Sequence, residues 1–195
     1  MKSSTLPLFL ALVITSCVQN GKVQQNDDAS AMNSTSSFNA MAITIDDVNQ
    51  KIEDLKFLTP LTSEQLKTLF PEAINGIKRS SMNTNSPEGL NVVEANYSQG
   101  NKDLKLTIYD CAGEAGAGIF ALGYVAQMNL QSESNKGYTR AMDFNGAKAI
   151  EAYEKSSNQS TFTYIINDRF MIVLTGKNID NASLRQMAQD LTFKV

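Results

Sequence analysis

The chain has 195 residues, 17 basic and 20 acidic side chains, and a formal charge of −3 at neutral pH. This mild acidity provides no basic surface for nucleic acid, so we expect no nucleic-acid partner. The chain has no histidine, which excludes Ser-His-Asp and Cys-His catalysis and histidine metal sites. We therefore expect no metal and no cofactor.

The first seventeen residues have the pattern of a short export signal. Lys2 provides a positive start, residues 6–14 are mostly apolar, and the small residues Thr15 and Ser16 precede Cys17. The apolar run is too short to span a bilayer as a mature helix, which is typical of a cleaved secretory signal.

The sequence Ile14-Thr15-Ser16-Cys17 resembles the lipobox of bacterial lipoprotein precursors. The resemblance implies cleavage before Cys17, a diacylglyceryl thioether on its sulfur, and usually an acyl chain on its new amino group. Two or three chains would anchor the protein firmly, because each buried methylene contributes ~0.8 kcal/mol. Some lipoproteins carry an aspartate directly after the cysteine, and it retains them in the inner membrane. This chain has Val18 at that position, so the outer membrane is favoured. The alternative is an ordinary cleaved signal in which Cys17 is incidental.

Composition divides the chain into three parts. Residues 1–16 form the signal peptide, residues 17–42 a flexible polar tether, and residues 43–195 a single globular domain. The tether is rich in Ser, Asn, Thr and Gln and cannot bury enough apolar surface to order itself. A flexible chain of its length has a root-mean-square span of roughly 25–30 Å.

Two helices are predicted at the start of the globular part. Apolar residues recur at helical spacing over residues 44–55, and Thr62 with Gln65 forms a capping box for a second helix. Alternating apolar residues then predict a hairpin of two strands at about residues 93–97 and 104–108.

A third helix is predicted over residues 114–130, with Phe120, Tyr124 and Met128 among its buried positions. Strands are predicted at residues 138–144, 147–153, 162–166 and 170–174. Asn145-Gly146 marks a two-residue hairpin turn between the first two of these strands. Asp180 caps a last helix that extends to about residue 191.

This order predicts an α+β domain with a mainly antiparallel sheet of about six strands and helices packed on it. The globular part also resembles uncharacterised secreted or lipid-anchored bacterial α+β domains, and its helix–sheet alternation resembles PsbP-type α/β sandwiches. The matching stretches are Leu66-Lys67-Thr68-Leu69-Phe70-Pro71, Gly76-Ile77-Lys78-Arg79, Leu104-Lys105-Leu106-Thr107-Ile108-Tyr109-Asp110 and Asp168-Arg169-Phe170. They transfer no functional residue to this chain.

Three residues are candidates for ligand binding. Arg140 and Lys148 flank the Asn145-Gly146 turn and could line a pocket for an anionic ligand, and Tyr109 lies opposite the apolar face of its strand. The alternative for the two cations is a solvated sheet face with ion pairs to nearby carboxylates.

Asp110, Cys111 and Glu114 lie together after a strand and could host acid–base or nucleophilic chemistry. A lone cysteine is more often a small buried hydrophobe. Lipidation of Cys17 would also leave Cys111 without a partner for an intramolecular disulfide.

The sequence thus predicts a membrane-anchored, non-catalytic lipoprotein of the cell envelope that binds a partner protein or a small ligand. The alternatives are a structural or assembly accessory of an envelope complex, and an enzyme with a site near Asp110, Cys111 and Glu114.

Overall fold

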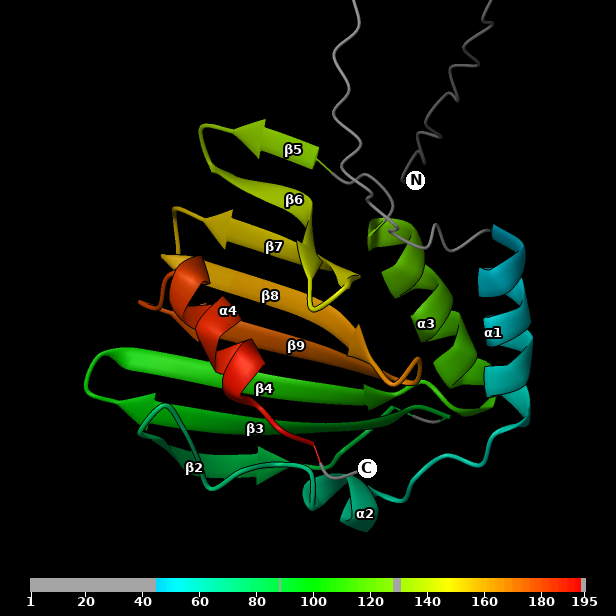
Figure 1. Ribbon diagram of the computed structural model, residues 1–195. Helices are drawn as coiled ribbons and strands as arrows, with labels where there is room; N and C mark the ends of the chain where they lie inside the picture. The colour runs from blue at the N-terminus through cyan, green and yellow to red at the C-terminus, as the bar shows by residue number, and fades with distance from the viewer. Residues whose placement is uncertain (1–44, 88, 128–130, 194–195) are drawn as a thin grey trace, which may run out of the picture. The chain divides into compact units, whose positions relative to one another are not determined.

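The structure, a computed structural model, describes residues 45–87, 89–127 and 131–193, which belong to the compact unit Ala40–Val195. Cys17, the predicted signal peptide and the predicted tether lie outside the described residues. Figure 1 shows the elements, which follow one another as α1 (Ile45–Phe57), α2 (Ser63–Lys67), β1 (Ala73–Ile74), β2 (Ile77–Asn83), β3 (Asn91–Gln99), β4 (Lys102–Asp110), α3 (Gly113–Gln127), β5 (Gln131–Ser134), β6 (Gly137–Phe144), β7 (Ala147–Glu154), β8 (Gln159–Ile166), β9 (Phe170–Lys177) and α4 (Asn181–Asp190). Within the described ranges, no helix is both long enough and apolar enough to cross a membrane.

All the strands belong to one antiparallel sheet, in the order β1-β2-β3-β4-β9-β8-β7-β6-β5. Two meanders, β1 to β4 and β5 to β9, are each built from neighbouring hairpins, and α3 connects one to the other. The pairing of β4 with β9 joins the two meanders into a continuous sheet.

The predicted α+β fold with about six strands is wrong. The described residues contain nine strands and four helices, so the fold is mainly sheet. The six expected strands are present as β3, β4 and β6 to β9. The prediction missed β1, β2 and β5, because β1 has two residues, β2 buries only Ile77, and β5 is exposed throughout. Such strands depend on main-chain hydrogen bonds to a neighbour and carry no apolar alternation.

The main core lies between the sheet and α4. Leu106, Leu174 and Phe162 are register partners across β4, β9 and β8, and all three are buried. Leu184 and Met187 of α4 pack in the same cluster. The cap predicted at Asp180 is confirmed, since its side chain accepts a hydrogen bond from the Ser183 amide.

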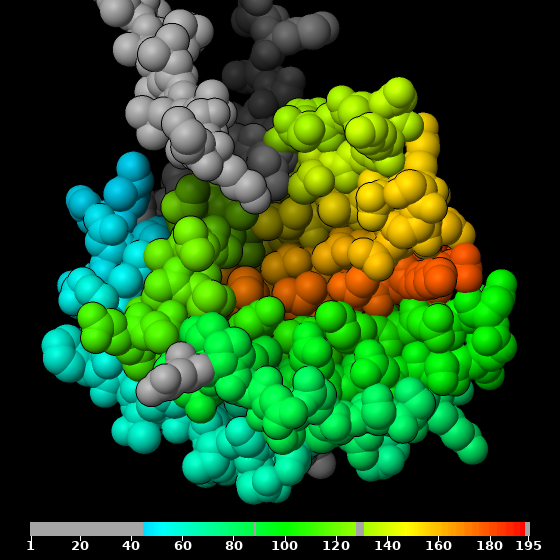
Figure 2. Space-filling view, turned by 180° about the vertical axis from the view of Figure 1, so that it is seen from behind, coloured from blue at the N-terminus to red at the C-terminus, as the bar shows by residue number. Residues whose placement is uncertain are grey.

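A smaller core lies at one end of the opposite face, beneath α3 and α1. Leu55 of α1 and Phe120 of α3 pack there with half-buried Tyr109 and Met171. Gly123 lets α3 lie close to the sheet, because a Cβ added at this position would lie 2.9 Å from the Met171 sulfur. Figure 2 shows this face from behind, with β9 and β4 side by side beyond the edge of α3.

The third helix is confirmed over residues 114–127 of its predicted range. Its described part ends at Gln127, and the predicted Met128 position lies outside the described residues. The Asn145-Gly146 turn is confirmed, since both residues have positive φ, of 51° and 81°.

Candidate functional site

A cavity of about 400 Å³ lies on the face of the sheet that carries α4, where the β9–α4 connection meets β6, β7 and β8. Its volume falls in the usual range for small-molecule sites, about 300–1,000 Å³. The lining residues are aromatic, amide, hydroxyl and aliphatic side chains with one carboxylate: Tyr138, Tyr153, Asn158, Ser160, Asn178, Ile179, Asp180 and Asn181.

A single row of register partners, three of which line the cavity, crosses this face of the sheet. Gly176 of β9 pairs with Ser160 of β8, Ser160 with Tyr153 of β7, and Tyr153 with Tyr138 of β6. Strand residues that pair across a sheet project from the same face. The row therefore changes from two small residues to two large rings, which leaves space above Ser160 beside the tyrosines.

Gly176 lets the β9–α4 connection lie close to the sheet. A Cβ at this position would lie 2.8 Å from Cβ of Ile179 and 3.1 Å from a methyl group of Leu184. The glycine therefore brings Ile179 and the start of α4 down beside Ser160, which forms the second wall of the cavity.

Two asparagines with left-handed backbone conformations form the rim. Asn158 and Asn178 have φ values of 48° and 56°, a region that asparagine tolerates better than most residues. The Tyr153 hydroxyl donates to Asn158 Oδ1 at 3.1 Å, and Asn158 Nδ2 donates to Asn178 Oδ1 at 2.8 Å. Asn178 Nδ2 in turn donates to the carbonyl of Asn101 at 2.6 Å. These bonds hold the rim amides and the Tyr153 ring in defined positions.

The first residues of α4 complete the lining. The Asp180 carboxylate accepts hydrogen bonds from the backbone amide and the hydroxyl of Ser183, at 2.8 and 3.1 Å. The hydrogen bond from the backbone amide lowers the pKa of Asp180 below its usual value. Asn181 Nδ2 donates to the Tyr138 hydroxyl at 2.9 Å and to the Ala152 carbonyl at 3.0 Å. Both donors of the Asn181 amide are therefore used, and its oxygen remains.

Two polar atoms of this lining are buried without a hydrogen-bond partner in the protein. They are Ser160 Oγ and Asn181 Oδ1, and their residues are only 1% and 7% exposed. A buried polar group without a partner costs about 1–3 kcal/mol. Both residues line the same cavity, so a molecule bound there would lie next to two side chains whose buried polar atoms lack a partner.

A buried carboxylate fixes the tyrosine wall from behind. The Glu151 side chain is fully buried and accepts from the Tyr138 hydroxyl at 3.0 Å and from Arg140 Nη2 at 2.6 Å. Arg185 of α4 donates to its other oxygen. The Arg140 guanidinium also lies 4.9 Å from the centre of the Tyr138 ring. Glu151 thus connects β6, β7 and α4 around the cavity.

The three predicted ligand-binding residues do not meet at one site. Arg140 pairs with Glu151 and reaches the cavity only through Tyr138. Lys148 forms an ion pair with exposed Asp143. Lys148 precedes Glu151 by three residues along β7, so its side chain projects from the opposite face of the sheet to that of Glu151. Tyr109 packs in the smaller core beside α3.

In the second predicted cluster, Asp110 and Cys111 are buried and Asp110 connects separate segments of the chain. Asp110 is fully buried and accepts from Arg169 through both of its oxygens, at 2.7 and 2.8 Å, and from the Leu61 amide at 2.7 Å. Burial raises the pKa of the neighbouring Cys111 thiol to about 12, which leaves almost no thiolate at neutral pH. Glu114 is exposed in the first turn of α3.

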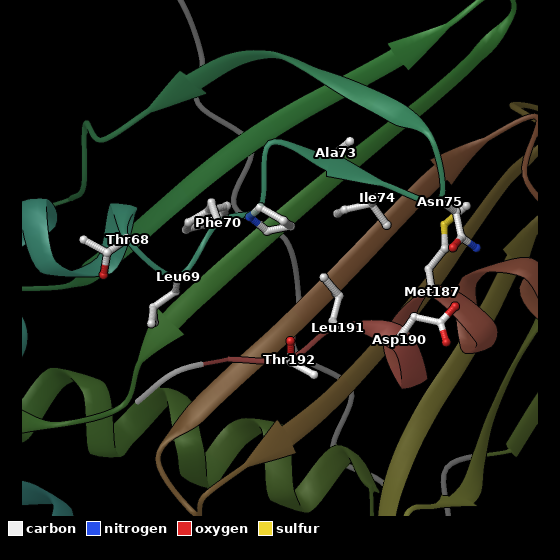
Figure 3. A pocket seen from close by; sticks show the side chains of 11 residues that line it. Thr68, Leu69, Phe70, Ala73, Ile74, Asn75, Met187, Asp190, Leu191 and Thr192 are labelled. Carbon is white, nitrogen blue, oxygen red and sulfur yellow. The ribbon is translucent and has the colours of Figure 1, made fainter.

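A second cavity of about 370 Å³ lies between the α2–β1 segment and the end of α4. Figure 3 shows Leu69, Phe70 and Ile74 on one side of it and Met187 and Leu191 on the other. None of the described residues that line it has a buried polar side-chain atom without a partner. It therefore lacks the feature that distinguishes the cavity beside Ser160.

Comparison with known proteins adds no assignment to this geometry. No family model, no curated protein and no solved structure matches the chain.

The buried pair between Asp110 and Arg169 makes a testable prediction about stability. The Arg169→Met variant leaves a buried carboxylate without its cation, so we expect the free energy of unfolding to fall by about 3 kcal/mol. The matched variant Lys148→Met breaks an exposed ion pair and should lose about 1 kcal/mol or less. Denaturant unfolding of both variants measures the difference, and equal losses would contradict the structural role of Asp110.

Proposed function

We propose that the protein is a non-catalytic lipoprotein of the bacterial cell envelope whose globular domain binds a small polar molecule in the cavity beside Ser160. The observation that carries the binding proposal is the pair of buried atoms, Ser160 Oγ and Asn181 Oδ1, which have no partner in the protein and belong to residues that line one cavity. The proposal of an anchor rests on the likeness of Ile14-Thr15-Ser16-Cys17 to a lipobox.

The chemistry of the lining supports binding rather than catalysis. A serine nucleophile needs a base within hydrogen-bond reach, and Ser160 Oγ has no hydrogen-bond partner. The carboxylate at the cavity, Asp180, is occupied in capping α4, and its lowered pKa makes it a weak base. The Cys111 thiol is buried beneath α3, with its pKa raised to about 12.

The proposed anchor gives the cavity a position in the cell. A lipid on Cys17 would hold the chain at a membrane, with the outer membrane favoured by Val18 at the following position. A flexible tether over residues 17–42 would let the domain move roughly 25–30 Å from the bilayer surface. The cavity would then meet molecules of the envelope.

The intact mass of the chain purified from its native membrane tests the anchor. We expect a mature chain that starts at Cys17 and carries a diacylglyceryl group and a further acyl chain. The Cys17→Ser variant should lack both lipids and leave the membrane fraction. An unmodified chain cut at another position would contradict the lipoprotein proposal.

Nuclear magnetic resonance of the full chain tests the cavity. The chain is kept in a detergent whose head group is neither a sugar nor a choline, and D-glucose, choline chloride and inorganic phosphate are added separately. We expect a saturable shift of the Asn158 and Asn181 side-chain amide signals with one of these three molecules, because both amides line the cavity. The absence of a saturable shift with all three would overturn the binding proposal.

A further inference from the structure

We propose that the molecule bound beside Ser160 is a sugar ring, that is, a neutral ring with several adjacent hydroxyl groups. This inference rests on the proposed binding function and adds the chemical class of the ligand. Three properties of the cavity lead to it: its charge, the hydrogen-bond groups that remain free, and its two aromatic rings.

The charge of the cavity disfavours an anion. Of the described residues that line it, none is lysine or arginine, and one, Asp180, is a carboxylate. An anionic ligand would lose its hydration without a lysine or arginine in the lining to pair with it, and it would lie near the Asp180 carboxylate. Phosphate and carboxylate ligands are therefore poor candidates.

A cationic ligand is disfavoured by the arginines behind the wall. The Arg140 guanidinium already lies 4.9 Å from the centre of the Tyr138 ring, so a second cation at that ring would be repelled. Arg185 brings another positive charge to the same buried carboxylate, Glu151. The Asp180 carboxylate is held by Ser183. A neutral ligand avoids all of these costs.

The free hydrogen-bond groups require at least one donor from the ligand. Asn181 Oδ1 can only accept, so the ligand must donate to it, whereas Ser160 Oγ can donate or accept. The hydroxyls of Tyr138 and Tyr153 already donate within the protein, to Glu151 and Asn158. A hydroxyl group fills either role, and neighbouring hydroxyls on one ring can serve Ser160 and Asn181 together.

The aromatic wall suits the apolar side of such a ring. The rings of Tyr138 and Tyr153 lie 6.1 Å apart with their planes tilted by 42°. Aromatic rings of this kind supply apolar contact area next to polar handles. A sugar ring has carbon-bound hydrogens on its faces and hydroxyls around its edge, so it can pack on the tyrosines and reach Ser160 and Asn181 with its edge.

Titration of the full chain with D-glucose tests this proposal, under the detergent conditions given above. We expect a saturable shift with a dissociation constant on the order of 1 mM, as a single small ring gives few contacts. Choline chloride and inorganic phosphate should bind at least tenfold more weakly.

Two serine variants provide the matched comparison. Ser160→Ala removes the free hydroxyl and should weaken glucose binding about three- to tenfold. It should not destabilise the fold, because the hydroxyl that is lost has no partner in the protein. Ser98→Ala replaces an exposed strand serine outside the cavity and should leave binding unchanged.

The outcomes separate the ligand class from the binding function. Saturable binding of choline or phosphate without glucose would overturn the sugar assignment and leave the binding function intact. Failure of all three molecules would overturn both. Glucose binding that Ser160→Ala leaves unchanged would overturn the assignment of the sugar to this cavity.

Discussion

The pairing of β4 with β9 is the constraint on which the rest of the structure depends. It connects strands that lie far apart in the sequence, through register partners such as Leu106 and Leu174, and it joins two local meanders into one sheet. Pairing of this kind must overcome the entropy of closing a long loop before it gains any contact. Buried leucines and isoleucines at the junction supply the apolar burial that stabilises it.

The path of the chain from β9 into α4 determines where the cavity lies. With β9 between β4 and β8, its last residues lead across the sheet face into α4, and Gly176 lets this connection lie beside Ser160. The residues that bound the cavity come from β6, β7, β8 and the β9–α4 connection, all in the second meander, and the first meander adds the Asn101 carbonyl that holds Asn178. Glu151, with Arg140 and Arg185, then holds the tyrosine side of the cavity to α4.

The sequence predicts the interior strands well because their apolar residues alternate, and it predicts the two capped helices because Thr62 and Asp180 are recognisable caps. It does not predict β1, β2 and β5, at the two ends of the sheet, because their pairing depends on main-chain hydrogen bonds to neighbours. The sequence gives a weak indication of the cavity, because Ser160 and Glu151 are polar residues at inward positions of strands whose burial alternates. Their position at a cavity depends on the strand register and on the path of the chain from β9 into α4, and neither can be predicted from local sequence patterns. Arg140 and Lys148 are close in sequence but project from opposite faces, which a different strand register would have changed.

The most direct measurement is a crystal structure of the chain soaked in D-glucose, compared with crystals kept without sugar. We expect a ring packed against Tyr138 and Tyr153, with hydroxyl groups within hydrogen-bond distance of Ser160 Oγ and Asn181 Oδ1. A cavity that holds only water in both sets of crystals would contradict it.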